Sequence, residues 1–250
     1  MTFFYNIFYQ FLYYPLLNAL ILLYNVLPGH DLGVAIIILT ILVRIILWPF
    51  SRQSLRSQKS LQDLQPKIKE IQKRYQDNKE EQAKAMMRLY QESGVNPMSG
   101  CLPLIIQFPI FIALYRVFIK GLTTKNLVHL YSFVSKPASL NVQFLGIFDL
   151  TKPNLLLAVF AGILQFIQLK MISDKQPKMM QSGDKSQSGL LKQSDISQAM
   201  GKQMTYLMPL LIVFFLWKLP SALGLYFVIT TAFSIVQQFL FYNRELESSK

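Results

Sequence analysis

One positive charge stands inside a long hydrophobic run. Arg44 lies near the middle of the segment from about Gly33 to Phe50, which otherwise has the composition of a membrane helix. An arginine at the centre of such a helix costs about 2.5–3.5 kcal/mol on insertion scales, and the local sequence offers no carboxylate as a partner. Arg44 therefore either reaches the near membrane surface, about 9 Å away at Ser51, or faces water within the bilayer.

Polar side chains also interrupt other hydrophobic segments. Thr40 shares a helix face with Arg44, one turn earlier, and Gln107 lies between two prolines. The last segment carries a polar stripe at helical spacing, made of Tyr226, Thr230, Ser234 and Gln237. Such groups are costly in lipid unless they are hydrogen-bonded, and bonding between packed helices is the simplest use of each one alone. Together with an arginine that lacks an acidic partner, they favour a shared hydrated cavity.

Catalytic and metal-binding groups are scarce. His30 and His129 fall in predicted loops, and no predicted membrane segment contains Asp, Glu or His. Cys101 is the only cysteine, which excludes an internal disulfide and a cysteine-based zinc site. A phosphate-binding loop of the GxxxxGK[ST] type is missing. The sequence predicts no catalytic residue, no metal and no cofactor, so the protein is not expected to be an enzyme.

The composition is typical of a helical membrane protein with several spans. Of the 250 residues, 52% are hydrophobic and 15% are charged. The predicted spans are about 33–50, 102–118, 154–170, 201–217 and 220–241. Of the 25 Lys and Arg residues, 18 lie in segments 51–101 and 170–203 or near the C-terminus. This excess predicts that those segments are cytoplasmic and that 121–153 is external.

The polar segment 51–101 has the periodicity of a helical hairpin. One apolar seam, at spacings of three and four, consists of Leu61, Leu64, Ile68, Ile71 and Tyr75. The charged segment Asp77–Glu81 predicts a turn, and a second stripe with Met86 and Met87 precedes the stop signal Ser93–Pro97. Pro66 is expected in the first turn of its helix or at a kink. An antiparallel hairpin is favoured over a plain connecting loop.

The segments at the N-terminus and between the third and fourth spans are less regular. Residues 1–30 include a stretch that is long enough to span but crowded with Tyr, Phe and Asn. Because aromatic residues favour the headgroup level, an interfacial helix is favoured over a spanning one. Residues 171–203 are rich in Ser, Gln and Lys, and are expected to be flexible. Residues 243–250 form a short cytoplasmic tail.

One long motif contains the arginine, and another runs through the second predicted span. They read TILVRIILWPFSRQSLRSQKSLQDLQPKIKEIQKRY and MMRLYQESGVNPMSGCLPLIIQFPIFIALYRVF. With shorter matches near Asp149, at Met208-Pro209 and in LYFVITTAFSIVQQ, the chain resembles the YidC/Oxa family of membrane protein insertases from about residue 31 to residue 242. Two departures are Pro220-Ser221-Ala222, where the family has glycine third, and a tail without excess basic charge, which argues against ribosome docking through it.

The resemblance implies an all-α polytopic fold and a site. The expected core, residues 31–242, has five helices around a hydrophilic groove, with a cytoplasmic hairpin at 51–101 and an N-terminal interfacial or spanning helix. Arg44 matches the family's groove arginine, Thr40, Gln107 and Tyr226 match groove positions, and Thr230 and Ser234 continue the stripe. The hairpin residues expected to contact substrate are Leu61, Leu64, Ile68, Ile71, Met86 and Met87.

The resemblance also implies a function. The expected activity is nucleotide-independent insertion of hydrophobic segments of nascent proteins into the bacterial plasma membrane, with hairpin and C-terminus cytoplasmic. Expected partners are nascent membrane proteins and lipid; the Sec translocon, the ribosome and the signal recognition machinery stay open, as do the clients and the oligomeric state.

Two other classes of function remain open. One is a small-solute channel or carrier, and the other is a tethering protein that works through the hairpin. DNA binding is not expected, because six acidic residues alternate with the basic ones in segment 51–101.

Overall fold

The chain folds into helices, as the sequence predicts, and into one very short β-hairpin, which it did not predict. The computed structural model describes residues 6–96, 102–120, 127, 129–174 and 193–248. Its elements are η1 (Tyr9–Tyr13, a π-helix), α2 (Tyr14–Val26), α3 (Leu32–Ile46), α4 (Trp48–Asp63), α5 (Gln65–Arg74), α6 (Lys79–Glu92), α7 (Leu102–Lys120), β1 (Gln143–Phe144), β2 (Phe148–Asp149), α8 (Leu155–Asp174), α9 (Gln193–Leu216) and α10 (Ser221–Ser248). The predicted fold class, an all-α polytopic membrane protein, is confirmed.

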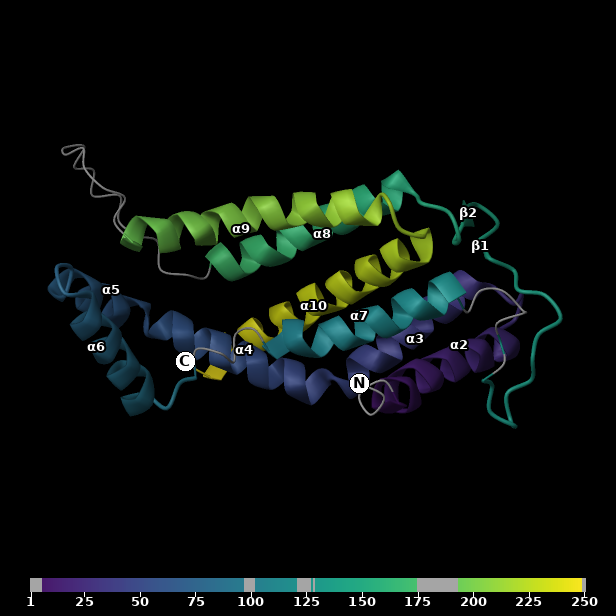
Figure 1. Cartoon of the computed structure of the whole chain (residues 1–250), viewed down its shortest axis with the longest axis horizontal. Helices are drawn as coiled ribbons and strands as arrows, with labels where there is room; N and C mark the ends of the chain where they lie inside the picture. The colour runs from purple at the N-terminus through teal and green to yellow at the C-terminus, as the bar shows by residue number, and fades with distance from the viewer. Residues whose placement is uncertain (1–5, 97–101, 121–126, 128, 175–192, 249–250) are drawn as a thin grey trace.

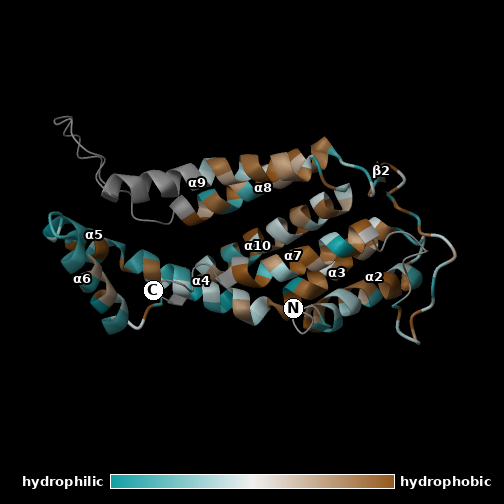
Figure 2. Ribbon diagram, viewed as in Figure 1, coloured by the Kyte–Doolittle hydropathy of each residue, from teal (hydrophilic) through white to brown (hydrophobic). Residues whose placement is uncertain are grey.

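The long helices form a bundle with a polar hairpin at one end. Helices α8 and α9 pack together along one side, α10 packs on α8 and on α3, and α2 packs on α3 (Figure 1). The β-hairpin lies at one end of the bundle, and α5 and α6 project at the other. Figure 2 shows hydrophilic residues on α5 and α6 and mainly hydrophobic ones on α8. This polarity agrees with a bundle in lipid and a hairpin in water.

Four of the five predicted spans each coincide with one helix of the structure, and the first is divided between α3 and α4. Within the described residues, Asn6–Val26, Leu155–Ile172 and Ser221–Asn243 are long and apolar enough to cross a membrane. The described apolar parts of α7 and α9, Ile105–Ile119 and Thr205–Leu216, are shorter. Helices α3 and α4 satisfy the same test only as a pair, bent by 61°.

The bend corrects the first predicted span, which was expected to continue to Phe50. The helix instead ends at Ile46, and a new one begins at Trp48 with Pro49 in its first turn. Proline has no N–H to donate, and its ring clashes with the carbonyl four residues earlier, so a continuous helix is disfavoured here. The first turn of a new helix tolerates the same residue.

Two predicted irregular segments are partly helical. The expected flexible segment 171–203 contains the end of α8 to Asp174 and the start of α9 from Gln193; residues 175–192 lie outside the described part. The expected tail is also helical as far as Ser248. The predicted spans were limited to bilayer thickness, whereas a helix continues into water wherever its backbone bonds are satisfied.

Helices α5 and α6 pack together as a hairpin, but the predicted seam is divided, because Leu61 lies in α4 and Ile68 and Ile71 lie in α5. Helix α5 begins with Pro66 in its first turn, and α6 ends at Glu92. The turn is shorter than expected, because Asn78 accepts a hydrogen bond from Glu81 N (3.2 Å) and starts α6 at Lys79. The predicted turn Asp77–Glu81 therefore becomes the cap and first turn of a helix.

The N-terminal helix is bound to the predicted external loop. The side chains of Asn18 and Tyr24 hydrogen-bond to backbone groups within residues 129–141. The length of Asn6–Val26 suits the spanning alternative. If this helix spanned the bilayer, however, the loop bound along its C-terminal half would lie in lipid, where unpaired backbone groups are costly. The hydrogen bonds therefore favour an interfacial position for that half.

Candidate functional site

Three predicted groove residues meet where α3, α7 and α10 approach one another. The Gln107 amide of α7 donates a hydrogen bond to the Tyr226 hydroxyl of α10. Arg44 of α3 is close enough to Tyr226 for an electrostatic interaction. Tyr226 is only 2% exposed. The junction thus joins a cation, a phenol and an amide from helices far apart in sequence.

Arg44 has no compensating carboxylate. It forms no ion pair with any residue that the structure describes. Its neighbours Ile45 and Ile46 are 54% and 71% exposed, whereas Arg44 itself is half-buried. Because the guanidinium is close to Tyr226, it lies toward the bundle and away from the exposed apolar side of α3. This geometry favours the hydrated-cavity alternative over simple snorkelling.

The other predicted groove residues are less exposed than an open groove requires. Thr40 and Ser234 donate to carbonyls one turn earlier, at Ile36 (2.6 Å) and Thr230 (2.9 Å), so both hydroxyls are satisfied within their own helices. The Thr230 hydroxyl is near Tyr226 but has no partner in hydrogen-bonding geometry among the described residues. All three side chains are at most 9% exposed. The stripe is covered in this conformation.

Buried polar residues continue from the stripe toward the hairpin; of these the sequence analysis named Gln237, but not Ser54, Gln62 or Gln238. Ser54 and Gln62 of α4 and Gln237 and Gln238 of α10 are all less than 9% exposed. Ser54, Gln58 and Gln62 recur at helical spacing, which is the signal that could have identified them. The sequence analysis placed Ser54, Gln58 and Gln62 in a hairpin exposed to water, where polar side chains are expected.

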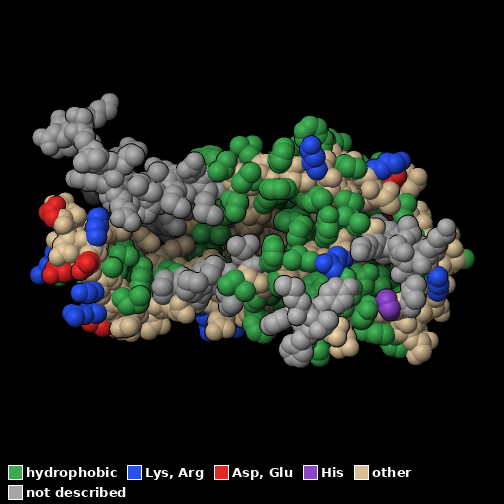
Figure 3. All heavy atoms as spheres, in the orientation of Figure 1, with side chains coloured by type: hydrophobic (Ala, Val, Ile, Leu, Met, Phe, Trp, Pro, Cys, Tyr) green, Lys and Arg blue, Asp and Glu red, His purple; other side chains and the backbone are tan. Residues whose placement is uncertain are grey.

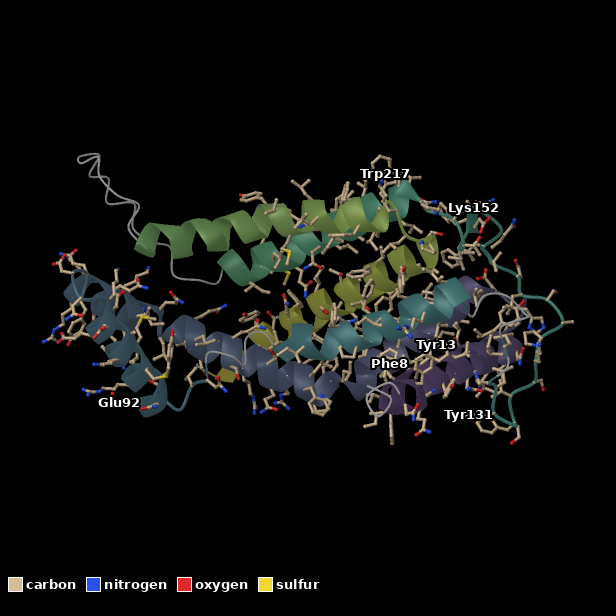
Figure 4. The ribbon with its side chains drawn as sticks, in the orientation of Figure 1. Phe8, Tyr13, Glu92, Tyr131, Lys152 and Trp217 are labelled. Carbon is tan, nitrogen blue, oxygen red and sulfur yellow. The ribbon has the colours of Figure 1, made fainter. Side chains whose placement is uncertain are left out.

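Arg116, which falls inside the predicted span 102–118, lies within α7 and contacts the N-terminal helix. Its guanidinium donates to the Tyr9 hydroxyl and lies 5.7 Å and 5.4 Å from the ring centres of Phe8 and Tyr9. Figure 4 labels Phe8 and Tyr13 at this contact. Cation–π and hydrogen bonds together hold the N-terminal helix to α7.

The predicted substrate-contact residues of the hairpin have two different roles. Leu64 and Ile68 are 8% and 6% exposed, and Leu61, Ile71 and Met86 are half-buried. Met87 is 56% exposed. The seam therefore stabilises the hairpin, and of these six side chains only Met87 is largely available to another chain.

The charged and apolar surfaces are separated along the molecule. In the view of Figure 3, Lys, Arg, Asp and Glu gather mainly at the two ends, and hydrophobic side chains dominate the middle. In the described part of the chain, no group of three or more His, Cys, Asp or Glu could hold a metal ion. The junction can therefore offer positive potential and hydrogen bonds, which are means of binding a polar or anionic group.

The chain matches known proteins over nearly its whole length. Residues 22–248 match the family described as 60Kd inner membrane protein. A membrane protein insertase YidC of Syntrophus aciditrophicus is 33% identical over 225 residues, 90% of this chain and 35% of that protein. YidC 2 of Listeria innocua is 34% identical over 238 residues, 94% of this chain and 71% of that protein. The chain thus spans about a third of the length of the first relative and most of the second.

Proposed function

Because the chain belongs to the 60Kd inner membrane protein family, the YidC/Oxa insertases, we propose that it inserts nascent proteins into the bilayer. The relatives described above are bacterial membrane protein insertases by name, and this chain is likewise a bacterial membrane protein. The family is not an enzyme family. The proposed substrates are hydrophobic segments of nascent membrane proteins, which leave the cytoplasm for lipid without bond chemistry or nucleotide.

The junction of Arg44, Gln107 and Tyr226 is the observation that carries this proposal. An arginine without an acidic partner, near the Tyr226 hydroxyl and away from the exposed side of α3, projects positive potential into the bundle. The short polar or acidic end of a client is attracted there and so crosses less hydrocarbon. The covered stripe of α10 has to open for this step, and α8 and α10 are the helices that would separate.

The exposed apolar faces supply the exit. Leu156, Phe160 and Ile163 of α8 are 73%, 50% and 51% exposed, and Phe239 of α10 is 57% exposed. A client helix that leaves along these faces buries its apolar surface in lipid, which contributes about 25 cal/mol per Å². This free energy drives the step in place of a nucleotide.

The proposed topology follows from the charges. The hairpin and the C-terminus are cytoplasmic, and the loop that binds Asn18 is external. Residues 31–242 form the insertase core, and residues 1–30 form the preceding helix. The hairpin makes the first contact with clients, through Met87 and its neighbours. The chain could act alone or beside a Sec-type channel, and the proposal covers both cases.

Reconstitution in nucleotide-free liposomes tests both the activity and the role of Arg44. A one- or two-span client with an acidic tail is synthesised in their presence, and its protection from protease is measured. We expect protection above that of empty liposomes, largely retained in Arg44→Lys and lost in Arg44→Ala and Arg44→Glu. Arg74→Glu, which reverses an exposed charge at the end of α5, is the matched control.

The possible results separate the two claims. Equal protection in all four variants would remove the electrostatic role of Arg44 and leave an insertase. Absence of protection for several clients would contradict autonomous insertion. If substitutions at Arg44, Gln107 and Tyr226 are harmless and deletion of the hairpin is not, the tethering alternative holds.

A further inference from the structure

The bend between α3 and α4 brings aromatic and basic side chains together at one level. Trp48, Arg52 and Arg56 follow at i, i+4 and i+8 along one side of α4. Residues at this spacing are neighbours on a helix surface. The 61° bend directs α4 away from the axis of α3 immediately before this group. The apolar helix α3 therefore ends just before the side of α4 that carries the aromatic and cationic residues.

The surface at the bend is exposed, and it changes from apolar to basic along the chain from Ile46 to Arg56. Ile46 and Phe50 are 71% and 51% exposed, and Trp48 is 38% exposed. Arg52 and Arg56, one and two turns further, are also exposed. Trp48 packs edge-on against Phe233 of α10, with ring centres 5.9 Å apart. The indole is thus fixed at the boundary between exposed hydrocarbon and exposed positive charge.

No carboxylate competes for these two arginines. The sequence contains no Asp or Glu between Asp31 and Asp63. Arg52 and Arg56 form no ion pair with any residue in the described part of the chain. From Ser221 to Asn243, α10, which packs against α4, contains no charged residue. The two guanidinium groups are therefore available to an external anion.

We propose that this bend is a binding site for an anionic phospholipid of the cytoplasmic leaflet. Guanidinium groups bind phosphate oxygens in pairs of hydrogen bonds. Tryptophan is favoured at the headgroup level, and exposed Ile46 and Phe50 fit the start of the acyl chains. Lipid bound here holds the base of α4, and with it the hairpin, at a fixed height above the membrane. This site lies outside the Arg44 junction and does not rest on the insertase proposal.

The two tryptophans of the chain allow a direct test. Trp217→Phe leaves Trp48 as the only tryptophan. This variant is reconstituted in phosphatidylcholine vesicles that contain a small fixed fraction of brominated phosphatidylglycerol or of brominated phosphatidylcholine. Bromine quenches only nearby indoles. We expect phosphatidylglycerol to be enriched about tenfold around Trp48 over its bulk fraction, and therefore to quench more strongly.

Three further variants make the result specific. Arg52→Gln with Arg56→Gln should remove the preference. Lys67→Gln with Arg74→Gln, which removes the same charge from exposed positions of α5, should retain it. The reverse reporter, Trp48→Phe with Trp217 kept, should show no preference. Equal quenching by both lipids in the parent protein, or loss of preference in the α5 control, would overturn the proposal in favour of diffuse attraction by net charge.

Discussion

The two ends of the bundle satisfy their polar groups in opposite ways. The end with the β-hairpin is called the outer end and the end with α5 and α6 the inner end, after the topology proposed above. At the outer end, helix side chains bind backbone groups of the loop before α8: Asn18 Oδ1 accepts from Tyr131 N at 2.6 Å, the Tyr24 hydroxyl from Asn141 N at 2.7 Å and Asp31 Oδ2 from Leu145 N at 2.7 Å, while Ser221 Oγ donates to the Asp149 carbonyl at 2.7 Å. Each bond links segments far apart in sequence. The outer end is therefore closed by directional contacts.

The inner end has buried polar atoms without such partners. Gln58 Oε1 and Gln238 Oε1 are buried and accept no hydrogen bond within the described residues. The Gln58 amide reaches only Ser54 Oγ, at a long 3.4 Å. A buried unsatisfied group costs about 1–3 kcal/mol, which water or another polar chain would recover. This difference is what the proposed function requires, because the end that would admit a client has to open and the other end has to stay closed.

Asp31→Ala should produce the largest loss at the outer end. Asp31 Oδ1 caps α3 by accepting from Gly33 N (2.7 Å) and Val34 N (3.1 Å), and Oδ2 holds the loop at Leu145. Loss of the cap and of a charge-assisted bond should lower the free energy of unfolding by about 2–4 kcal/mol. Denaturation in mixed micelles measures this loss. Asp31→Asn, which keeps the cap oxygen but cannot accept from Leu145 N with its amide nitrogen, should lose less; equal losses would show that the cap contributes nothing.

Gly33→Val tests how closely the β-hairpin packs on α3. A Cβ at Gly33 would lie 2.2–2.7 Å from atoms of the Phe144 side chain, well inside contact distance. Displacing that ring should cost about 1–3 kcal/mol. In a Phe144→Ala background the same substitution should cost at least about 1 kcal/mol less, because the ring is absent. A cost that is independent of Phe144 would mean that the ring moves away freely.

The sequence predicted the helices better than their contacts. Long apolar runs identify spans whatever they pack against, and a polar residue such as Arg44 or Gln107 is conspicuous within them. That Arg44, Gln107 and Tyr226 share one site was implied by the family resemblance. Periodicity and composition alone could not predict it, since it depends on how three helices cross. The bend was missed although Pro49 marks it.

Gln238→Leu should be neutral or raise the free energy of unfolding by up to about 1 kcal/mol. The substitution removes a buried acceptor that has no partner and fills similar space. The matched change at the outer end, Asn18→Leu, removes an amide that makes bonds at both atoms and should cost about 2–4 kcal/mol. Unfolding in the same micelles compares the two. A similar loss at both positions would contradict the contrast between the ends.

The smallest expected effect is a pH response confined to the outer loop. The pKa of Asp149 is lowered to about 2, first because the Thr151 hydroxyl donates to it (2.6 Å), and also through hydrogen bonds from Lys152 and from Thr151 N. A lowered carboxyl pKa stabilises the loop fully above its ordinary value, about 3.9, and this contribution disappears as pH falls toward 2. The Thr151 amide chemical shift should therefore titrate below pH 4 in the wild type and stay constant in Asp149→Asn. Titration near pH 4 would mean that these bonds do not persist in solution, and the Asp149 carboxylate would then add nothing to the contacts that Asn18, Tyr24, Asp31 and Ser221 make with the loop.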